Sequence, residues 1–341
     1  MPKSSVAERA PEGNSTGARF GLSEARSVDK PRRRGFVDLH LVFVLVIVLS
    51  TTACGSVVGT QSASQSTQNG SESPQAEPLT GSAEDYERAR FDDSTHIDNK
   101  WLPLKPGTQF VYEGSTFIVE EKRREKHRVV FTVTDLTKVI DGLRTLVVWD
   151  RDYSGGQLVE TELAFHVQDN DGNVWHLGQY PEEYENGKFA KAPAWIVGRK
   201  GAQAGISMKA EPRLGAPSYA QGYAPPPLNW DDRARVYKVG QKVCVPVDCY
   251  ENVLVTEEFE PSIPGVYQLK YYASGVGNIR VSWRGKKQDE RETLELVDLK
   301  HLSPEAMAKV RKEVMELDRH AYERSEVYRD TSPVEPLQGR Q

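Results

Sequence analysis

The chain has 341 residues, with 44 lysines and arginines against 49 aspartates and glutamates, and a formal net charge of −5. This length allows two average domains or one large β domain with tails. The near-neutral, slightly acidic balance excludes the usual nucleic-acid binder, whose affinity comes mostly from neutralising phosphates. Three cysteines are too few for a disulfide scaffold.

Residues 1–53 are predicted to form a bacterial lipoprotein signal peptide. A basic cluster, Arg32–Arg34, precedes a strongly apolar run, Leu41–Leu49. As a helix this run would rise only about 15 Å, half of a bilayer span, so it fits a secretory signal better than a transmembrane helix. The small residues after it resemble the lipobox of bacterial lipoproteins, although Thr51 stands where leucine is usual. This resemblance implies that Cys54 is diacylated and becomes the new N-terminus.

The predicted location is therefore outside the cytoplasm, with lipid anchoring the protein to the outer face of the cytoplasmic membrane or cell envelope. Arg33–Val37 also resembles a twin-arginine export signal, so the choice between that route and the general secretory route stays open; the very apolar run favours the latter. Cleavage before Cys54 removes eight basic and five acidic residues and leaves a net charge of −8. Lipid rather than charge must then hold the protein at an anionic membrane.

The two remaining cysteines, Cys244 and Cys249, are expected to form one structural disulfide. An even number of cysteines in an oxidising compartment is typical of disulfide pairing. The four residues between them suit a tight loop whose ends approach to bonding distance. Two thiols alone cannot complete a zinc site, and the spacing is not that of a redox pair.

Residues 54–88 are predicted to be a flexible tether, and residues 89–302 a single antiparallel β domain resembling an open barrel. The tether is rich in Ser, Gln and Gly, and a coil of this kind reaches about 30 Å. In the β domain, runs of β-branched and aromatic residues alternate with turn clusters. The predicted strands are Thr108–Glu113, Ser115–Glu121, Arg128–Val139, Leu143–Asp150, Leu158–Gln168, Asn173–Tyr180, Arg233–Val239, Glu251–Phe259, Tyr267–Ala273, Gly277–Trp283 and Thr293–Leu299.

The stretch from Pro193 to Pro227 has six prolines and five glycines and no sustained periodicity. We expect a long, extended surface excursion there, and loops of this length are either functional or poorly ordered.

The chain is predicted to end in a helix over residues 303–330 that packs on the sheet, followed by a tail over residues 331–341. Ser303 is a good N-cap and Pro304 suits the first helical position. Apolar residues then recur every three or four positions, which predicts one buried stripe.

Two histidines form the most interesting polar feature. If Asn170–Gly172 makes a three-residue loop with Gly172 in the left-handed conformation, His166 and His176 lie directly opposite each other on one face of a hairpin. A loop of two or four residues would put them on opposite faces. Even the favourable register offers two ligands where zinc needs three or four, so we expect no metal site and no cofactor.

Aromatic side chains could line an apolar or sugar-binding cleft, although core packing explains most tryptophans. The candidate ligand contacts are His166, His176, Trp149, Trp175 and Trp230. No sequence motif for a catalytic residue is present: the chain has no G-x-S-x-G elbow, no P-loop and no H-E-x-x-H helix.

Several segments together resemble a family of uncharacterised exported bacterial proteins. They are the D-N-x-x-x-P-L-x-P-G-T opening from Asp98 to Thr108, the D-x-D-G-N-V-W segment from Asp169 to Trp175, the E-Y-E-N-G-K segment from Glu183 to Lys188, and the Y-Y-A-x-G-V-G segment from Tyr271 to Gly277. The resemblance covers residues 91–300 or so. It implies export and a single β-rich unit, and it is silent on catalytic residues.

Three functions follow as hypotheses. The first is a lipid-anchored, non-catalytic β domain of the cell envelope that binds something or supports envelope structure. The second is a carrier that holds a lipid or another hydrophobic ligand in a cavity between sheet and helix. The third is an extracytoplasmic hydrolase with its site in the 193–227 region, which would require a nucleophile and a base to converge in space.

Overall fold

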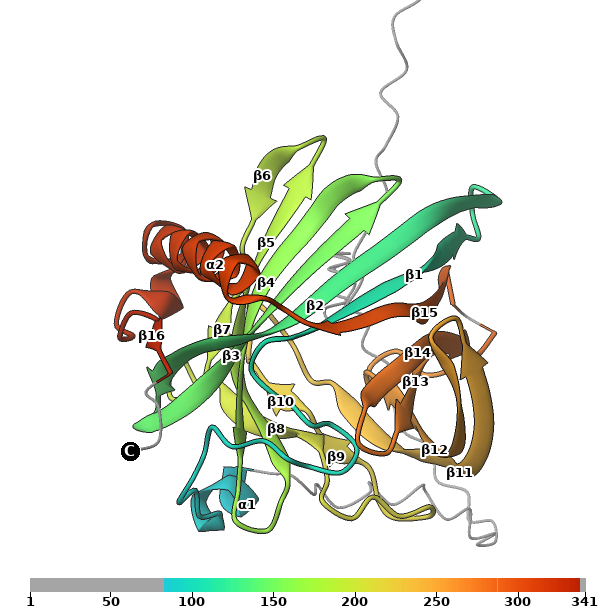
Figure 1. Ribbon diagram of the computed structural model, residues 1–341, viewed down its shortest axis with the longest axis horizontal. Coiled ribbons are helices and arrows are strands. Elements are labelled where there is room, and N and C mark those ends of the chain that lie inside the picture. The colour runs from blue at the N-terminus through green and yellow to red at the C-terminus, as the bar shows by residue number, and fades with distance from the viewer. Residues whose placement is uncertain (1–82, 287, 338–341) are drawn as a thin grey trace, which may run out of the picture. The chain divides into compact units, whose positions relative to one another are not determined.

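A computed structural model of the protein describes residues 83–286 and 288–337. The predicted signal peptide, the lipidation site Cys54 and most of the tether lie outside the described residues. As predicted, the described part is mainly β, with a single antiparallel sheet and one long helix near its C-terminal end (Figure 1).

The sequence forms two α-helices, one short 3-10 helix and sixteen strands over the described residues. The helices are α1 (Ala83–Arg88), α2 (Pro304–Arg324) and η1 (Glu326–Tyr328). The strands are β1 (Thr108–Ile118), β2 (Arg123–Ile140), β3 (Leu143–Ser154), β4 (Gln157–Gln168), β5 (Val174–Glu185), β6 (Lys188–Lys191), β7 (Trp195–Ile196), β8 (Gln203–Met208), β9 (Tyr219–Ala220), β10 (Gly222–Tyr223), β11 (Arg233–Val245), β12 (Asp248–Phe259), β13 (Tyr267–Ala273), β14 (Gly277–Arg284), β15 (Glu290–His301) and β16 (Glu335–Pro336).

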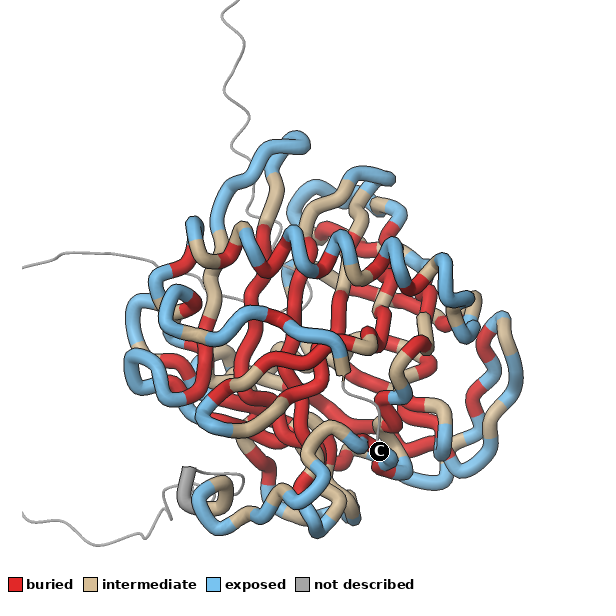
Figure 2. The backbone as a smooth tube through the Cα atoms, turned by 60° about the vertical axis from the view of Figure 1, so that its left-hand side comes forward, coloured by how far each residue is buried: buried red, intermediate tan, exposed pale blue. Residues whose placement is uncertain are grey.

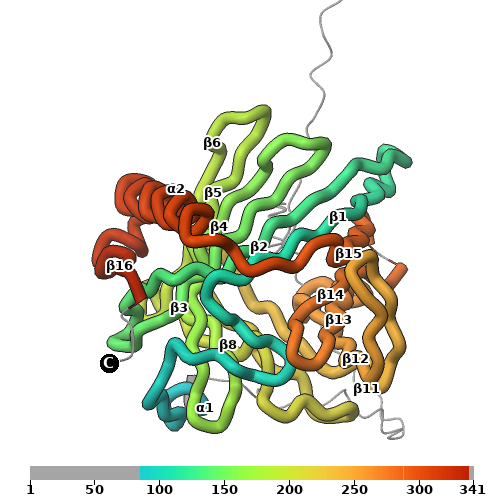
Figure 3. The backbone as a smooth tube through the Cα atoms, in the orientation of Figure 1, coloured from blue at the N-terminus to red at the C-terminus, as the bar shows by residue number. Residues whose placement is uncertain are grey.

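The sheet is two meanders joined by the pairing of β1 with β15. Its strand order is β10-β8-β5-β4-β3-β2-β1-β15-β14-β13-β12-β11-β9. The teal β1 and the red-orange β15 therefore run side by side although they are far apart in sequence (Figure 3). The two ends of this order, β9 and β10, are separated only by Gln221, so the sheet nearly closes on itself.

Strand β1 is continuous, whereas the sequence suggested a break at Gly114. A side chain at Gly114 would collide with the backbone carbonyl oxygen of Thr293 on β15. Glycine therefore permits the close approach of two paired backbones here, which is one of its roles inside a strand.

The predicted C-terminal helix is present and packs on the sheet. The Ser303 hydroxyl caps it by accepting a hydrogen bond from the Ala306 N–H at 3.3 Å. The predicted stripe is buried, namely Met307, Val310, Val314, Leu317 and Ala321. Along α2, buried and exposed segments alternate in Figure 2, as expected for an amphipathic helix. The helix ends at Arg324, six residues before the predicted end, and the short η1 follows it.

The expectation of a long surface excursion over residues 193–227 was wrong. This segment forms four short strands, β7 to β10, and strands β8, β9 and β10 complete the two ends of the sheet. Trp195 on β7 is 2% exposed. Strands of only two to six residues are too short to give a visible alternation of apolar and polar residues, so the sequence pattern did not predict them.

The start of the described chain also differs from the prediction. Residues 83–88, which we assigned to the tether, form α1. The Tyr86 ring packs against Trp175, with ring centroids 5.5 Å apart, so the end of the predicted tether is attached to the sheet.

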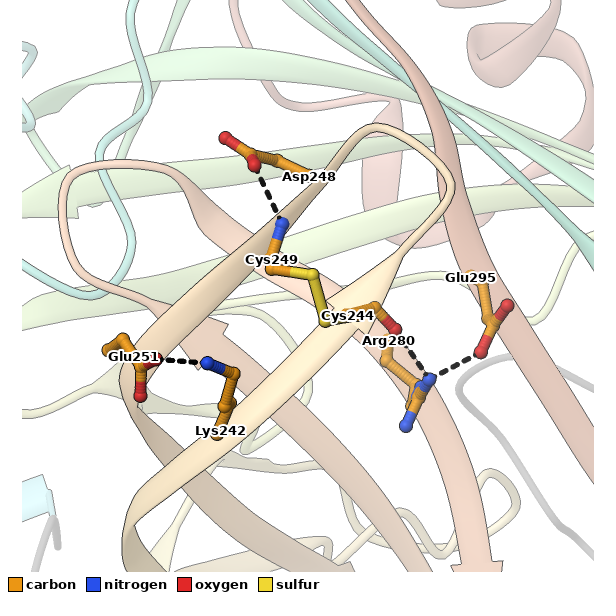
Figure 4. The surroundings of a disulfide bond; sticks show 7 residues. All are labelled: Lys242, Cys244, Asp248, Cys249, Glu251, Arg280 and Glu295. Atoms are coloured by element: carbon orange, nitrogen blue, oxygen red, sulfur yellow. Dashed lines mark hydrogen bonds and ion pairs between the residues drawn. A yellow bond between two sulfur atoms is a disulfide. The ribbon is translucent and has the colours of Figure 1, made fainter.

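Cys244 and Cys249 form a disulfide across the tip of the β11–β12 hairpin. Figure 4 shows the bridge with its neighbours: Arg280 on β14 donates a hydrogen bond to the Cys244 carbonyl oxygen at 2.9 Å and another to Glu295 at 2.5 Å. The bridge and this arginine together fix the hairpin against the next strands.

Candidate functional site

The curved sheet lines a cavity of about 140 Å³. We call the sheet face that lines it the inner face, and the opposite face, which α2 covers, the helix face. Most of the cavity wall is apolar. The apolar lining residues are Leu102, Leu104, Phe110, Tyr112, Val129, Phe131, Val148, Ala164, Trp230, Tyr272, Val276, Val281 and Leu294.

Strand alternation explains how one stretch of sequence serves both faces. Successive side chains of a strand point to opposite sides. On β3, Val148 and Asp150 line the cavity, whereas Trp149 between them is buried in the core beneath α2. On β4, Glu162 lines the cavity and its neighbour Leu163 belongs to the core on the helix face.

Polar side chains from several strands also line the cavity. They are Asp150, Glu162, His166, His176, Gln179, Ser207, Gln221, Glu258, Gln268, Lys270 and Glu292, together with Asn278. Polar groups removed from bulk water normally find hydrogen-bond partners. Several atoms of this group have none among the described residues: Asp150 Oδ1, Glu162 Oε2, His166 Nδ1, His176 Nε2 and both amide atoms of Gln179.

Asp150 and Glu162 are direct cross-strand partners on β3 and β4, so their carboxyl groups share one part of the cavity. Burial, and then the negative charge of Asp152, raise the pKa of Asp150 to about 7. Burial, and then the charge of Asp150, raise the pKa of Glu162 to about 8, and Lys270 only partly opposes this rise. Two neighbouring carboxyl groups in this position resist ionisation unless a positive charge reaches them.

The other two lining carboxylates have cationic partners. Glu258 on β12 lies 2.7 Å from Lys270 on β13. Glu292 on β15 lies 2.8 Å from His127 Nδ1, and the opposite ring nitrogen of His127 lies 2.6 Å from Asp152. Burial alone would lower the pKa of His127, but hydrogen bonds and charges of the two carboxylates raise it to about 10. His127 is therefore an imidazolium held between two carboxylates.

The two predicted histidines do lie directly opposite each other. The loop is Asn170–Gly172, and the Gly172 N–H donates to the Asp169 carbonyl oxygen at 3.0 Å with φ of +90°. His166 pairs with His176 across β4 and β5, and their rings stack at 4.9 Å. Burial, and then Lys270, lower the pKa of His166 to about 4; burial and the neighbouring ring also hold the pKa of His176 well below its usual range. Both rings are neutral near pH 7.

The structure places three of the five candidate contact residues at the cavity and two away from it. His166, His176 and Trp230 line the cavity, and contact with a ligand remains a prediction for them. Trp149 and Trp175 lie on the helix face, in the core beneath α2 and beside α1. Strand alternation explains the split, because both tryptophans are sequence neighbours of inner-face residues.

Sequence reasoning missed the acidic part of the site. Asp150, Glu162, Gln179 and Lys270 match no motif, and polar residues that alternate with apolar ones usually mark a solvated face. A nearly closed sheet reverses this reading, because its inner face can be polar as well as enclosed. One signal could have found the acidic pair. Asp150 and Glu162 lie in neighbouring strands whose alternate positions carry large apolar residues, so a charged residue in each strand must face the other side of the same sheet.

The geometry does not favour the hydrolase hypothesis. Ser207 lines the cavity with both histidines, so a hydroxyl, an imidazole and carboxylates share this space. A nucleophile needs a base within hydrogen-bond reach. His166 Nδ1 and His176 Nε2 have no hydrogen-bond partner among the described residues, so neither of these atoms is paired with the serine.

The described residues hold no group of three or more His, Cys, Asp or Glu side chains arranged to bind a metal ion. Within residues 83–286 and 288–337, no helix is both long enough and apolar enough to cross a membrane.

Comparison with models of known protein families and with curated proteins finds no match to this chain. Among solved structures, the chain is similar to a Bacteroides fragilis protein named "putative exported protein with YmcC-like fold", at 13% identity over 59% of this chain and 99% of that chain, with a TM-score of 0.36. It is also similar to a "putative lipoprotein" from Parabacteroides distasonis, at 12% identity over 60% of this chain and 100% of that chain, with a TM-score of 0.32. Similarity at this level assigns neither a fold family nor a function.

Proposed function

We propose that this protein is an extracytoplasmic, non-catalytic binding protein that is anchored to the bacterial envelope through a lipidated Cys54 and holds a small molecule inside its sheet. The anchor rests on the basic cluster, the short apolar run and the lipobox-like residues before Cys54. The binding role rests on the cavity.

The observation that carries the binding role is the set of unpartnered polar atoms in the cavity wall. Glu162 is 4% exposed and Gln179 is 1% exposed, yet Glu162 Oε2 and both amide atoms of Gln179 have no hydrogen-bond partner among the described residues. An unmade hydrogen bond of a buried group costs about 1–3 kcal/mol. Three such atoms around one cavity support a bound molecule that completes their hydrogen bonds.

The size and place of the cavity argue against the lipid-carrier hypothesis as first framed. None of the cavity-lining residues in the described part belongs to α2, and the apolar stripe of α2 is buried against the helix face. The cavity is also smaller than the pockets of about 300–1,000 Å³ that enclose drug-sized ligands. It is comparable to an engineered cavity of about 150 Å³ that binds benzene, so the expected ligand is about the size of one ring.

Binding can be tested with three ring-sized probes of different charge, para-fluorobenzylamine, para-fluorobenzyl alcohol and para-fluorobenzoate. Fluorine NMR of each probe would be recorded with the full chain in nanodiscs, and empty nanodiscs would correct for partition into lipid. We expect at least one probe to bind saturably. Ala164→Phe should abolish this binding, because Ala164 lies in the cavity wall between Val148 and Gln179.

The matched control is Ala190→Phe, which adds the same ring at an exposed position of β6 and should leave binding unchanged. If Ala164→Phe does not fold by circular dichroism, Ala164→Leu replaces it. Binding that survives a folded cavity-filling variant, or the absence of saturable binding of all three probes, would refute the proposed function.

The anchor has a separate test. Mass spectrometry of the membrane-extracted protein should show an acylated N-terminal Cys54, and Cys54→Ser should prevent acylation and leave the unprocessed chain. An intact N-terminus on wild-type protein in the soluble fraction would contradict lipidation.

A further inference from the structure

The carboxyl groups around the cavity are not equally paired with cations, and the unpaired ones are neighbours. Four carboxylates line the cavity, and two of them have cationic partners within 2.8 Å: Glu258 with Lys270, and Glu292 with His127. For the adjacent pair Asp150 and Glu162 no ion pair is found among the described residues, and each has an oxygen without a hydrogen-bond partner. Among the described residues, this pair of carboxyl groups therefore has no cation at ion-pair distance.

The chain's own cations near this pair are already engaged or directed elsewhere. Arg151, the next residue after Asp150, stacks its guanidinium on the Trp149 ring at 3.9 Å, and Trp149 belongs to the core on the helix face. Lys270 pairs with Glu258. His166 stays neutral because burial lowers its pKa to about 4. A cation for Asp150 and Glu162 would have to come from outside the described part of the chain.

The rest of the wall suits an apolar group. Phe110 and Phe131 meet edge to face at 5.8 Å, and Tyr112 donates its hydroxyl to the Asn278 carbonyl oxygen at 2.8 Å, which leaves the tyrosine ring as part of the lining. Aromatic faces attract cations as well as apolar groups. A hydrated inorganic cation would instead need several oxygen ligands, which a mainly apolar wall does not supply.

We propose that the ligand is a small organic cation: a protonated amine that places its ammonium group between Asp150 and Glu162 and an apolar group of about one ring against Phe110 and Phe131. This inference rests on the proposed binding function and names its ligand class. Gln179, which pairs with Ala164 in the adjacent strands, supplies an amide oxygen that accepts a further ammonium hydrogen.

The test uses the same three fluorinated probes with the full chain in nanodiscs at about pH 8. The amine should bind at least tenfold more tightly than the alcohol, because hydrogen bonds between charged groups are stronger than hydrogen bonds of a neutral hydroxyl. The benzoate should bind weakest, since its carboxylate and the acidic side chains of the site repel each other.

Two variants locate the preference. Glu162→Gln and Asp150→Asn should each weaken amine binding about tenfold and leave alcohol binding within about twofold. Glu185→Gln, at an exposed position at the end of β5, is the matched control and should change neither. A thermal melt of each variant reports whether it folds. If Glu162→Gln does not fold, the test rests on Asp150→Asn alone.

The outcomes separate the two proposals. If the alcohol or the benzoate binds as tightly as the amine and Ala164→Phe blocks it, the organic-cation inference is overturned while the binding function stands. If the amine binds best but both carboxyl variants retain that preference, the ammonium position is overturned. If none of the probes binds saturably, the binding function itself fails.

Discussion

The two faces of strands β3 and β4 differ in how completely they are packed. On the helix face, Val147, Leu163 and Phe165 are fully buried and touch a core that α2 completes. On the inner face, Asp150 and Glu162 border a cavity and keep unpartnered oxygens. The same backbone therefore carries a close-packed side and a hollow, charged side.

This difference separates stability from binding. A packed apolar face supplies the free energy that holds a domain together, since about 25 cal/mol is gained per Å² of apolar surface buried. A face with unmade hydrogen bonds lowers stability and leaves interactions for a ligand. We infer that packing on the helix face stabilises the fold. This stabilisation offsets the cost of the unmade hydrogen bonds on the inner face. The four predictions that follow test this division, from the largest expected effect to the smallest.

The largest expected effect comes from emptying the helix face. Phe165→Ala should lower the free energy of unfolding by about 3–5 kcal/mol, because Phe165 is 0% exposed and packs against Tyr328. Phe131→Ala on the inner face, the matched control, should cost only about 1–2 kcal/mol, since its ring already borders a cavity. Denaturant unfolding of the full chain, followed by circular dichroism, measures both values. Equal costs for the two variants would contradict the division.

The second prediction concerns pH and the inner face. The folded state holds the pKa of Glu162 near 8, whereas an unfolded glutamate ionises near 4.5. As pH rises from 4.5 to 8, the unfolded chain loses this proton before the folded chain does, so Glu162 makes the ligand-free protein less stable with rising pH. Glu162→Gln removes this dependence and should stabilise the protein by roughly 3–5 kcal/mol at about pH 8.5, with little effect at about pH 4.5.

Thermal melts at several pH values, with Glu185→Gln as the exposed control, measure this effect. The variant should still lose stability between pH 6.5 and about 10, because His127 keeps its proton in the folded state up to a pKa of about 10 and the unfolded chain does not. A Glu162→Gln variant that is less stable than the wild type at pH 8.5 would show that this carboxylate has a partner in the protein.

The third prediction concerns the disulfide, which lies at a hairpin tip and lines neither face of β3 and β4. Replacing Cys244 and Cys249 by serine should destabilise the protein by about 2 kcal/mol, because closing a loop of so few residues removes little entropy from the unfolded chain. Binding of the fluorinated probes should not change, since neither cysteine lines the cavity. A loss of probe binding in the folded variant would show that the hairpin tip shapes the inner face.

The smallest expected effect is at the start of α2. Ser303→Ala should cost about 0.5–1 kcal/mol through loss of the N-cap hydrogen bond to the Ala306 N–H. Ser303→Asp should restore the cap and the stability. Neither variant should change probe binding, since the helix face and the cavity are separate. If the alanine variant weakens probe binding, the two faces are coupled.

Local patterns predicted much of the fold. The mainly β class, the one C-terminal helix and its N-cap at Ser303 follow from short-range preferences that tertiary packing did not override. The facing of His166 and His176 follows from one loop, because a three-residue loop with a left-handed glycine fixes the register of the hairpin.

The remainder depends on contacts between distant residues. The chain pairs β1 with β15 and closes the sheet with β8, β9 and β10, and no local pattern encodes which strand meets which. The acidic pair was missed for the same reason: Asp150 and Glu162 are ordinary charged residues in two strands until the sheet curves and removes them from water. The candidate tryptophans were assigned from composition, which does not say on which face of the sheet a side chain lies. Trp230 therefore lines the cavity, whereas Trp149 and Trp175 do not.

The way the sheet ends has a consequence for aggregation. An exposed edge strand offers unpaired N–H and carbonyl groups that can recruit a strand from another molecule and start aggregation. Along the main strand path, both terminal strands, β9 and β10, are only two residues long, and a single residue joins them. However, β9 pairs with only Arg233 and Ala234 of β11, so most of β11 has an open edge in the described part of the chain. Lys238 and Lys242 on β11 and the irregular register of its pairing with β12 discourage edge-to-edge association. We therefore expect these features, rather than closure of the sheet, to protect this β-rich chain from forming fibres.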